Sequence, residues 1–312
     1  MGGETVDTTT TQTQAEQALL SGLVEHGLLI PCGVPGLYGR GAVFEDLLTR
    51  FHAFVSRETQ GDGASAVHFP PVMNRKVMER ADYLESFPHL AGLVFSFKGN
   101  ERQHHDLVGR VQRAEDYSAL QSITDVVLTP AACHPLYPTC SGRLPNGGRL
   151  FDLTSYCFRH EPSADPARMQ AFRMREHVRL GTPDDVKAWR DSWRTRGLEL
   201  LRRLGLPAYE APANDPFFGR AGKLLAENQQ QQQLKFELVL PITSEARPTA
   251  IMSFNYHTDH FTKLYAIESA GGELAHSACL GFGLERIAIG LFKTHGFDPQ
   301  RWPHAVREQL WG

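Results

Sequence analysis

Apolar residues follow helical spacing in the first part of the chain and strand spacing in its middle. Apolar positions three or four residues apart predict helices over Gln14–Leu29, Ala42–Glu58 and Asn74–Phe87. Between Val126 and Leu280 the pattern is mostly that of strands, and a last helix is expected over Leu284–Phe292. Because few helices interrupt these strands, we expect an α+β fold with a mainly antiparallel central sheet flanked by helices.

Further elements are expected in the second half of the chain. A long helix with arginines on its outer face is predicted over Pro183–Leu204. Asp215 is in a position to cap a helix that starts at Pro216 and continues into a glutamine run. The apolar runs Leu234–Ile242 and Thr249–His257 predict two neighbouring strands.

A polar loop between two strands stands out at residues 157–181. Cys157–Glu161 and Phe172–Leu180 alternate like strands, and Pro162–Ala171 is the loop between them. This hairpin carries three arginines and a glutamate: Arg159, Arg168, Arg173 and Glu161. Guanidinium groups bind phosphate oxygens in pairs, so the hairpin could hold a polyphosphate. Taken alone, an arginine-rich hairpin is more often a solvated surface.

Two glycines precede the last helix in the run Gly281–Arg286. Glycine lets the backbone approach a ligand closely, and a helix N-terminus favours an anion. Arg286 lies in the first turn, where a cation opposes the helix dipole, which suggests that its charge is used on a nucleotide. Taken alone, two glycines before a helix more often serve packing.

Two cysteines and a glutamate on or beside predicted strands form a candidate metal site. Cys133, Glu176 and Cys279 would leave one position open on a tetrahedral catalytic zinc. The chain has no CxxC or HxxxH motif, so ordinary buried cysteines are the alternative. Three histidines are rival ligands: His134, His160 and His276. No Ser–His–Asp or Cys–His order marks a protein nucleophile.

Composition and charge exclude several classes of protein. The 312 residues carry a net charge of −3, which provides no basic field for a long nucleic acid. No apolar run is long enough to span a membrane. The polar N-terminus does not have the pattern of a signal peptide, and residues 1–17 are expected to be a disordered tail. Five widely spaced cysteines argue for a reducing, cytoplasmic location.

Taken together, these stretches resemble the catalytic domain of class II aminoacyl-tRNA synthetases. Phe158–Glu161 is similar to the second signature of that class, and Gly281–Arg286 is similar to the third. Ala42–Phe69 and the two prolines after it loosely resemble the first signature, which lies at the dimer interface. The three occur in order over residues 42–292, so the resemblance implies the class II fold and a homodimer.

Within this class the chain looks most like the methanogen-type seryl-tRNA synthetases, which bind the substrate amine through zinc. Cys133, Glu176 and Cys279 match the ligands of that zinc. Only residues 1–41 precede the first signature and residues 293–312 follow the last helix, so no tRNA-binding domain is expected. Such truncated chains resemble the amino acid:carrier protein ligases, which activate glycine or alanine and load the phosphopantetheine thiol of a carrier protein.

The resemblance also implies a role for each site residue. Arg159 would be catalytic at the α-phosphate, and Arg168 and Arg286 would hold the β- and γ-phosphates of ATP, with magnesium bound to the phosphates. Phe172 would stack on adenine. The remaining residues implied at the ATP site are Glu161, Met169, Ala250 and Ser253. The residues implied for the amino acid are Glu176, Ser253 and Asn255.

Residues 18–312 would then form one catalytic domain with an inserted helix at about residues 215–233. In the family this helix docks an acidic carrier protein, and the implied contacts are Phe217, Arg220, Lys223 and Leu224. Two rival functions remain: a minimal seryl-tRNA-synthetase-like enzyme that aminoacylates tRNA, and a non-catalytic regulatory paralogue. The retained phosphate ligands Arg159 and Arg286, with Glu161, argue against the second rival.

Overall fold

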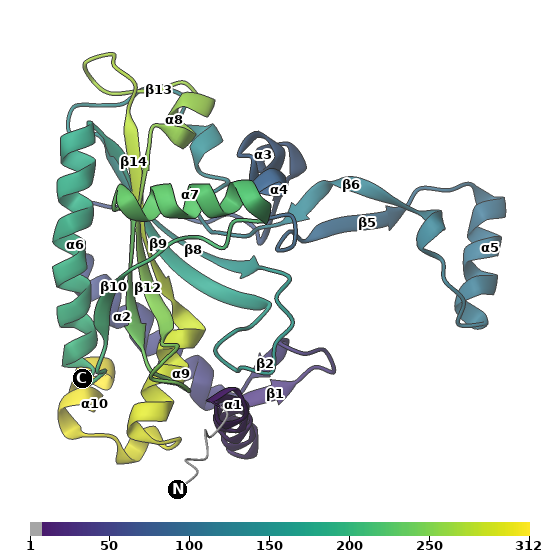
Figure 1. Ribbon diagram of the computed structural model, residues 1–312, viewed down its shortest axis with the longest axis horizontal. Helices are drawn as coiled ribbons and strands as arrows, with labels where there is room; N and C mark the ends of the chain where they lie inside the picture. The colour runs from purple at the N-terminus through teal and green to yellow at the C-terminus, as the bar shows by residue number, and fades with distance from the viewer. Residues whose placement is uncertain (1–7) are drawn as a thin grey trace, which may run out of the picture.

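A seven-stranded sheet forms the centre of the molecule (Figure 1). The structure is a computed structural model that describes residues 8–312, without the side chains of residues 8–11, 220, 221 and 228. All neighbouring strands are antiparallel except β8 and β3, which confirms the predicted α+β class. In sheet order the strands are β10 (Tyr209–Pro212), β11 (Lys235–Leu240), β12 (Thr249–Thr258), β14 (His276–Gly283), β9 (Ala171–Gly181), β8 (Arg149–Phe158) and β3 (Ser65–Val67).

Three long helices cover one face of this sheet: α2 (Ala42–Thr59), α6 (Pro183–Arg203) and α9 (Leu284–His295). Phe282 of β14 lies among them, with its ring 5.9 Å from Phe51 of α2 and 6.3 Å from Trp193 of α6. Successive strand residues point to opposite faces, so Cys279 and Gly281 point away from this core. The face without these helices is therefore the one available for a site.

Smaller elements surround the sheet. They are α1 (Thr8–Glu25), β1 (Leu29–Pro31), β2 (Tyr38–Arg40), β4 (Val72–Asn74), α3 (Arg75–Arg80), α4 (Tyr83–Ser86), β7 (Gly142–Arg143), α7 (Gly219–Gln231), α8 (His260–Leu264), β13 (Ile267–Glu268) and α10 (His304–Trp311). Figure 1 shows α7 crossing in front of the sheet. Among residues 8–312, no helix is both long and apolar enough to cross a membrane.

A narrow arm projects from the body (Figure 1). It consists of β5 (Leu93–Phe97), α5 (Glu101–Gln112) and β6 (Gln121–Leu128), and α5 has no buried residue. The exposed large apolar side chains of the arm are Leu93, Phe95, Val108, Val111, Tyr117, Ile123 and Val126. At its base β6 pairs with β4 and leads into the loop that carries Cys133.

Several boundaries differ from those expected. Residues 8–17 are helical rather than a disordered tail, because α1 is anchored by Leu19 and Leu23 in the main core; residues 1–7 lie outside the described part. The predicted helix Asn74–Phe87 is broken into α3 and α4, since Asp82 adopts a left-handed conformation with φ of 54°. The glycine run before α9 belongs to β14, which extends to Gly283.

Candidate functional site

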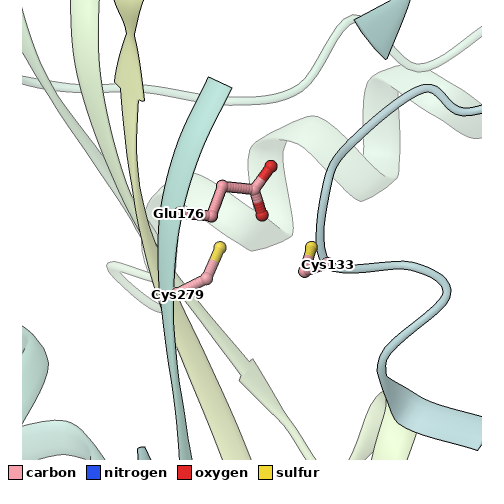
Figure 2. A group of neighbouring side chains, drawn as sticks. All are labelled: Cys133, Glu176 and Cys279. Atoms are coloured by element: carbon pink, nitrogen blue, oxygen red, sulfur yellow. The ribbon is translucent and has the colours of Figure 1, made fainter. Parts of the chain in front are cut away.

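Two thiols and a carboxylate meet on the face of the sheet opposite the three long helices (Figure 2). Glu176 comes from β9, Cys279 comes from the adjacent strand β14, and Cys133 comes from the loop after β6. Their ligand atoms all lie within 4.8 Å of one another, and all three residues are buried. The structure thus brings together the three residues that the sequence nominated from positions far apart in the chain.

The loop that carries Cys133 is held against the sheet by backbone hydrogen bonds. Thr129 N–H donates to the Pro71 carbonyl, and Phe158 N–H donates to the Thr129 carbonyl. The backbone N–H of Ala132 donates to Glu176 Oε1 at 2.8 Å, while Glu176 Oε2 is buried with no hydrogen-bond partner. A buried oxygen without a partner is costly, so this carboxylate is arranged to bind something that the protein alone does not supply.

Burial governs the protonation of this group. Desolvation, with a further contribution from Cys279, raises the pKa of Glu176 to about 7. The hydrogen bond between the two thiols raises the pKa of Cys133 and lowers that of Cys279. Two thiols and one carboxylate, one oxygen of which has no hydrogen-bond partner, fit a zinc ion that keeps a fourth position open.

None of the three rival histidines belongs to this group of donor atoms among the described residues. His134 is buried between the rings of Tyr83 and Phe261, and burial lowers its pKa to about 3. His276 is hydrogen-bonded to the hydroxyl of Tyr256 at 2.5 Å, and His160 is exposed.

Three guanidinium groups lie near one another, and one of them, Arg159, is also close enough to Glu176 to lower its pKa. Arg159 Nε donates to the Pro130 carbonyl, and its guanidinium lies 5.5 Å from the centre of the Phe172 ring. Arg286 donates to the carbonyls of Ala167 and Ala250. Burial lowers the pKa of Arg286, and the positive charges of Arg168 and Arg159 lower it further. These cations are close enough to repel one another, and such a site favours an anion with several charges.

The loop of the central hairpin carries three further residues predicted at the ATP site, which are Glu161, Arg168 and Met169. Arg168 and Glu161 form an ion pair of 3.1 Å, and Arg168 is exposed. Met169 is buried in the main core, with Sδ 3.4 Å from Arg40 Nη2. The side chain thus packs inside the protein, and its implied position near adenine stays a prediction.

Arg173 does not belong to the cation cluster, so its assignment to a phosphate-binding hairpin is wrong. Its guanidinium binds Glu45 at 2.7 Å and Glu285 at 2.9 Å. The reason is strand alternation: Phe172 and Met174 lie on either side of Arg173 in β9 and point to the opposite face. Arg173 therefore joins α2 and α9 to the sheet.

The strand β12 contributes the predicted substrate residues to the same face as the thiols. Ser253 is directly opposite Gly281, and Asn255 is directly opposite Cys279. Asn255 Nδ2 lies 3.4 Å from Cys279 Sγ. A Cβ at Gly281 would come within 3.3 Å of Ser253 Oγ and 2.9 Å of Met174 Cε, so glycine keeps this part of the face open.

Asp215 does not cap a helix, contrary to the sequence prediction. Its carboxylate accepts hydrogen bonds from Lys235 at 2.5 Å and from Gln229 at 2.8 Å, and α7 begins only at Gly219. Lys235 is buried and also contacts Glu237 at 3.2 Å. Sequence reasoning missed this group, although the charges of Lys235 and Glu237 alternating with buried residues in β11 gave a signal.

The predicted docking residues divide into two sets. Lys223 and Leu224 are exposed on α7, and Leu224 is 69% exposed. Phe217 precedes the helix and stacks on Phe87 of the body with ring centres 5.0 Å apart. The side chain of Arg220 lies outside the described residues.

Comparison with known proteins adds the family. No protein-family model matches the chain. Amino acid–acyl-carrier-protein ligase 1 from Bradyrhizobium diazoefficiens is 46% identical over 280 residues, which cover 89% of this chain and 86% of that protein. The chain belongs to the amino acid–acyl-carrier-protein ligase family. It is therefore a ligase, and the family predicted from its motifs is confirmed.

More distant relatives of this ligase are tRNA synthetases. The type-2 serine–tRNA ligase of Methanopyrus kandleri is 25% identical over 278 residues, which cover 82% of this chain and 53% of that protein. The solved M. kandleri SerRS, bound to a tRNA, superimposes with a TM-score of 0.79 at 21% identity, covering 93% of this chain and 59% of the other. The ligase thus has the class II fold and spans about half the length of these relatives.

Proposed function

We propose that this ligase activates a small amino acid, glycine or alanine, with ATP and transfers it to the phosphopantetheine thiol of a carrier protein. The observation that carries this proposal is a cluster of arginines, Arg159, Arg168 and Arg286, whose member Arg159 also acts on Glu176 of the buried thiol and carboxylate group. The first set suits the phosphates of ATP, and the second suits a metal that selects an amine. The name of the Bradyrhizobium relative supports the carrier protein as acceptor.

The first half-reaction forms an aminoacyl-adenylate. A carboxylate oxygen of the amino acid attacks the α-phosphorus of ATP, and pyrophosphate leaves. Arg159 stabilises the charge that builds up on the α-phosphate, and Arg168 and Arg286 orient the leaving pyrophosphate. Phe172 offers a ring face to adenine, and Glu161, Ala250 and Ser253 complete the proposed ATP site. Magnesium bound with ATP would neutralise part of the phosphate charge.

Cys133, Glu176 and Cys279 would hold a zinc ion, which supplies a Lewis-acid position for the α-amine of the substrate. The donor atoms and the unpartnered Glu176 Oε2 fit this ion. Ser253 and Asn255 line the same face and would orient the carboxylate of the amino acid. A requirement for a free amine follows, together with a fixed distance between the amine and the reacting carboxylate.

The second half-reaction needs no nucleophile from the protein. The pantetheine sulfur attacks the carbonyl carbon of the adenylate, a thioester forms, and AMP leaves while the thiol proton passes to solvent or to the phosphate. An acidic carrier protein would dock on α7 through Lys223, Leu224, Arg220 and the adjoining Phe217. The exposed Lys223 and Leu224 support a face that combines positive charge with apolar area.

We also propose that the ligase is a cytoplasmic homodimer that does not act on tRNA. The five free cysteines fit a reducing compartment. The segment Ala42–Phe69 would lie at the dimer interface, as its resemblance to the first signature implies.

The proposal is tested by pyrophosphate exchange into ATP with a panel of small amino acids, before and after metal removal. Exchange with glycine or alanine, lost on chelation and restored by zinc, supports it. Exchange that a chelator leaves unchanged contradicts the metal assignment, and no exchange with any amino acid favours a non-catalytic role.

A further inference from the structure

Cys279 differs from Cys133 in having nitrogen donors at its sulfur. Asn255 Nδ2 lies 3.4 Å from Cys279 Sγ, and His257 Nε2 lies 3.5 Å from the same atom. Both distances suit N–H···S hydrogen bonds, which are longer than those to oxygen. Among the described residues, no side-chain nitrogen makes a comparable contact with Cys133.

The other nitrogen of His257 is also engaged. His257 Nδ1 lies 3.1 Å from Ser277 Oγ and 3.3 Å from the hydroxyl of Tyr137. Both hydroxyl groups can donate to Nδ1, and an Nδ1 that accepts leaves the ring proton on Nε2, facing the sulfur.

An irregularity in the sheet places this ring. The pairing of β12 with β14 shifts between Tyr256 and Thr258, so His257 is the extra residue of a β-bulge. Bulges redirect side chains, and they recur next to functional sites. The ring is then fixed edge-on by its neighbours, at 88° to Tyr137 and 81° to Phe261. The orientation of His257 is thus determined by two aromatic rings and two hydroxyl groups.

We propose that His257 is a positioning residue of the metal site: it donates Nε2–H to Cys279 Sγ and holds that sulfur in the direction that a metal requires. Asn255 gives a second donor to the same sulfur, in addition to any contact with substrate. This inference rests on the zinc site of the proposed function. It assigns Cys279 as the preorganised ligand, whereas Cys133 depends on its loop.

The test compares His257→Asn with His257→Gln. The amide nitrogen of asparagine lies near the place of Nδ1 and falls short of Cys279, whereas that of glutamine reaches the place of Nε2. Partners behind metal ligands typically change metal affinity 10- to 100-fold, so we expect His257→Asn to raise the zinc dissociation constant by about that factor. We expect His257→Gln to stay within about threefold of the unmodified ligase, on the same scale.

Zinc affinity is measured by competition with a chromophoric chelator. The cobalt-substituted protein is then examined for its thiolate-to-cobalt absorption, which reports the sulfur ligand itself. A purely structural role of His257 would leave this absorption unchanged. His260→Gln is the matched control, because His260 is an exposed histidine of the neighbouring helix α8 whose ring packs against Phe261. Ser277→Ala removes a partner of Nδ1 without enlarging the side chain, and serves if His257→Asn fails to fold.

The outcomes separate the two proposals. If the unmodified ligase binds no stoichiometric zinc, the metal assignment of the proposed function fails. If it binds zinc and both His257→Asn and Ser277→Ala bind it equally well, the positioning role of His257 is overturned while the proposed function stands. Weaker binding in His257→Asn, recovery in His257→Gln and an unchanged His260→Gln support the inference.

Discussion

Arg159 and Arg173 come from one hairpin but lie in opposite environments. Arg173 is neutralised by Glu45 and Glu285, whereas Arg159 is close enough to Arg286 to lower its pKa. Their positions separate them: Arg173 lies inside β9 and points to the face with the helices, whereas Arg159 follows the end of β8. The charge of Arg159 is therefore available to a ligand, and that of Arg173 is not.

Replacing Arg159 with glutamine should lower the rate of adenylate formation by about 100- to 1000-fold, as the loss of a transition-state donor does elsewhere. Pyrophosphate exchange measures this rate, and thermal unfolding checks that the fold is kept. Arg149→Gln, an exposed arginine near the start of β8, serves as the control. Equal effects of the two substitutions would remove Arg159 from the catalytic role.

The raised pKa of Glu176 predicts how the stability of the metal-free ligase depends on pH. Its pKa is raised from 4.5 to about 7 in the folded protein, so the metal-free fold binds a proton that the unfolded chain has already lost between these pH values. The metal-free ligase should therefore lose stability as the pH rises from 4.5 to 7, by on the order of 3 kcal/mol. Urea unfolding of the chelated protein measures this, and Glu176→Gln should flatten the dependence. An unchanged slope in that variant would contradict a buried, protonatable Glu176.

At the residue scale, the chemistry of the metal donors was predictable and their supports were not. Cys133, Glu176 and Cys279 offer two thiols and a carboxylate on or beside predicted strands, and the family resemblance singled them out. The contact of His257 with Cys279 was not predictable, because it depends on a bulge, and the apolar and polar pattern of β12 does not reveal where a ladder shifts.

At the scale of elements, α7 and the segment before it are tied to the body at both ends. Phe218 N–H donates to the Ser86 carbonyl, and Gln229 binds both the backbone and the carboxylate of Asp215. The outer surface of the helix remains exposed at Lys223, Leu224 and Leu225. A docking helix needs this combination of a fixed position on the body and an exposed outer surface.

Reversing the charges of Arg220 and Lys223 together should slow transfer to an acidic carrier protein by roughly tenfold or more, because charge complementarity accelerates association. Pyrophosphate exchange should be unaffected, because both residues are proposed to dock the carrier protein and neither is proposed to bind ATP. Lys187→Glu on α6 provides a matched charge reversal at an exposed site. The docking assignment fails if exchange and transfer fall together.

Local patterns predicted most elements but not this segment. An aspartate before a proline is a common helix start, yet Asp215 is held by the buried Lys235 and the helix begins four residues later, at Gly219. A buried ion pair between distant residues overrides a local capping preference, and it is invisible to a reading of neighbouring residues.

At the scale of the whole molecule, the arm is the part with the least packing of its own. A β-ribbon with a 12-residue helix that buries no side chain is marginal in water by itself. The arm nevertheless exposes Phe95 at 55% and Val111 at 56%. Its exposure was not predictable, because Leu93–Phe97 reads like any buried strand. The class II fold as a whole was predictable, because three separated motifs in order constrain it far more than any one of them.

We expect the ligase to be a dimer in solution, in which the second copy covers the arm as well as the segment Ala42–Phe69. Phe95→Asp combined with Val111→Asp should then shift the mass measured by light scattering toward that of a monomer, because buried charge opposes association. Val34→Asp, at another exposed apolar position, should leave the mass unchanged. A monomeric unmodified protein would contradict the proposed dimer, and a dimer insensitive to both arm substitutions would place the interface elsewhere.

Identifying the acceptor of the labelled amino acid is the measurement that tests the central claim most directly. Labelled glycine or alanine, ATP and the ligase are incubated with a phosphopantetheine-bearing acidic carrier protein, with the same carrier lacking that group, or with tRNA. Our account predicts label on the first acceptor alone, in a linkage that hydroxylamine cleaves as it cleaves a thioester. Label on tRNA, or equal label on the carrier that lacks phosphopantetheine, would contradict it.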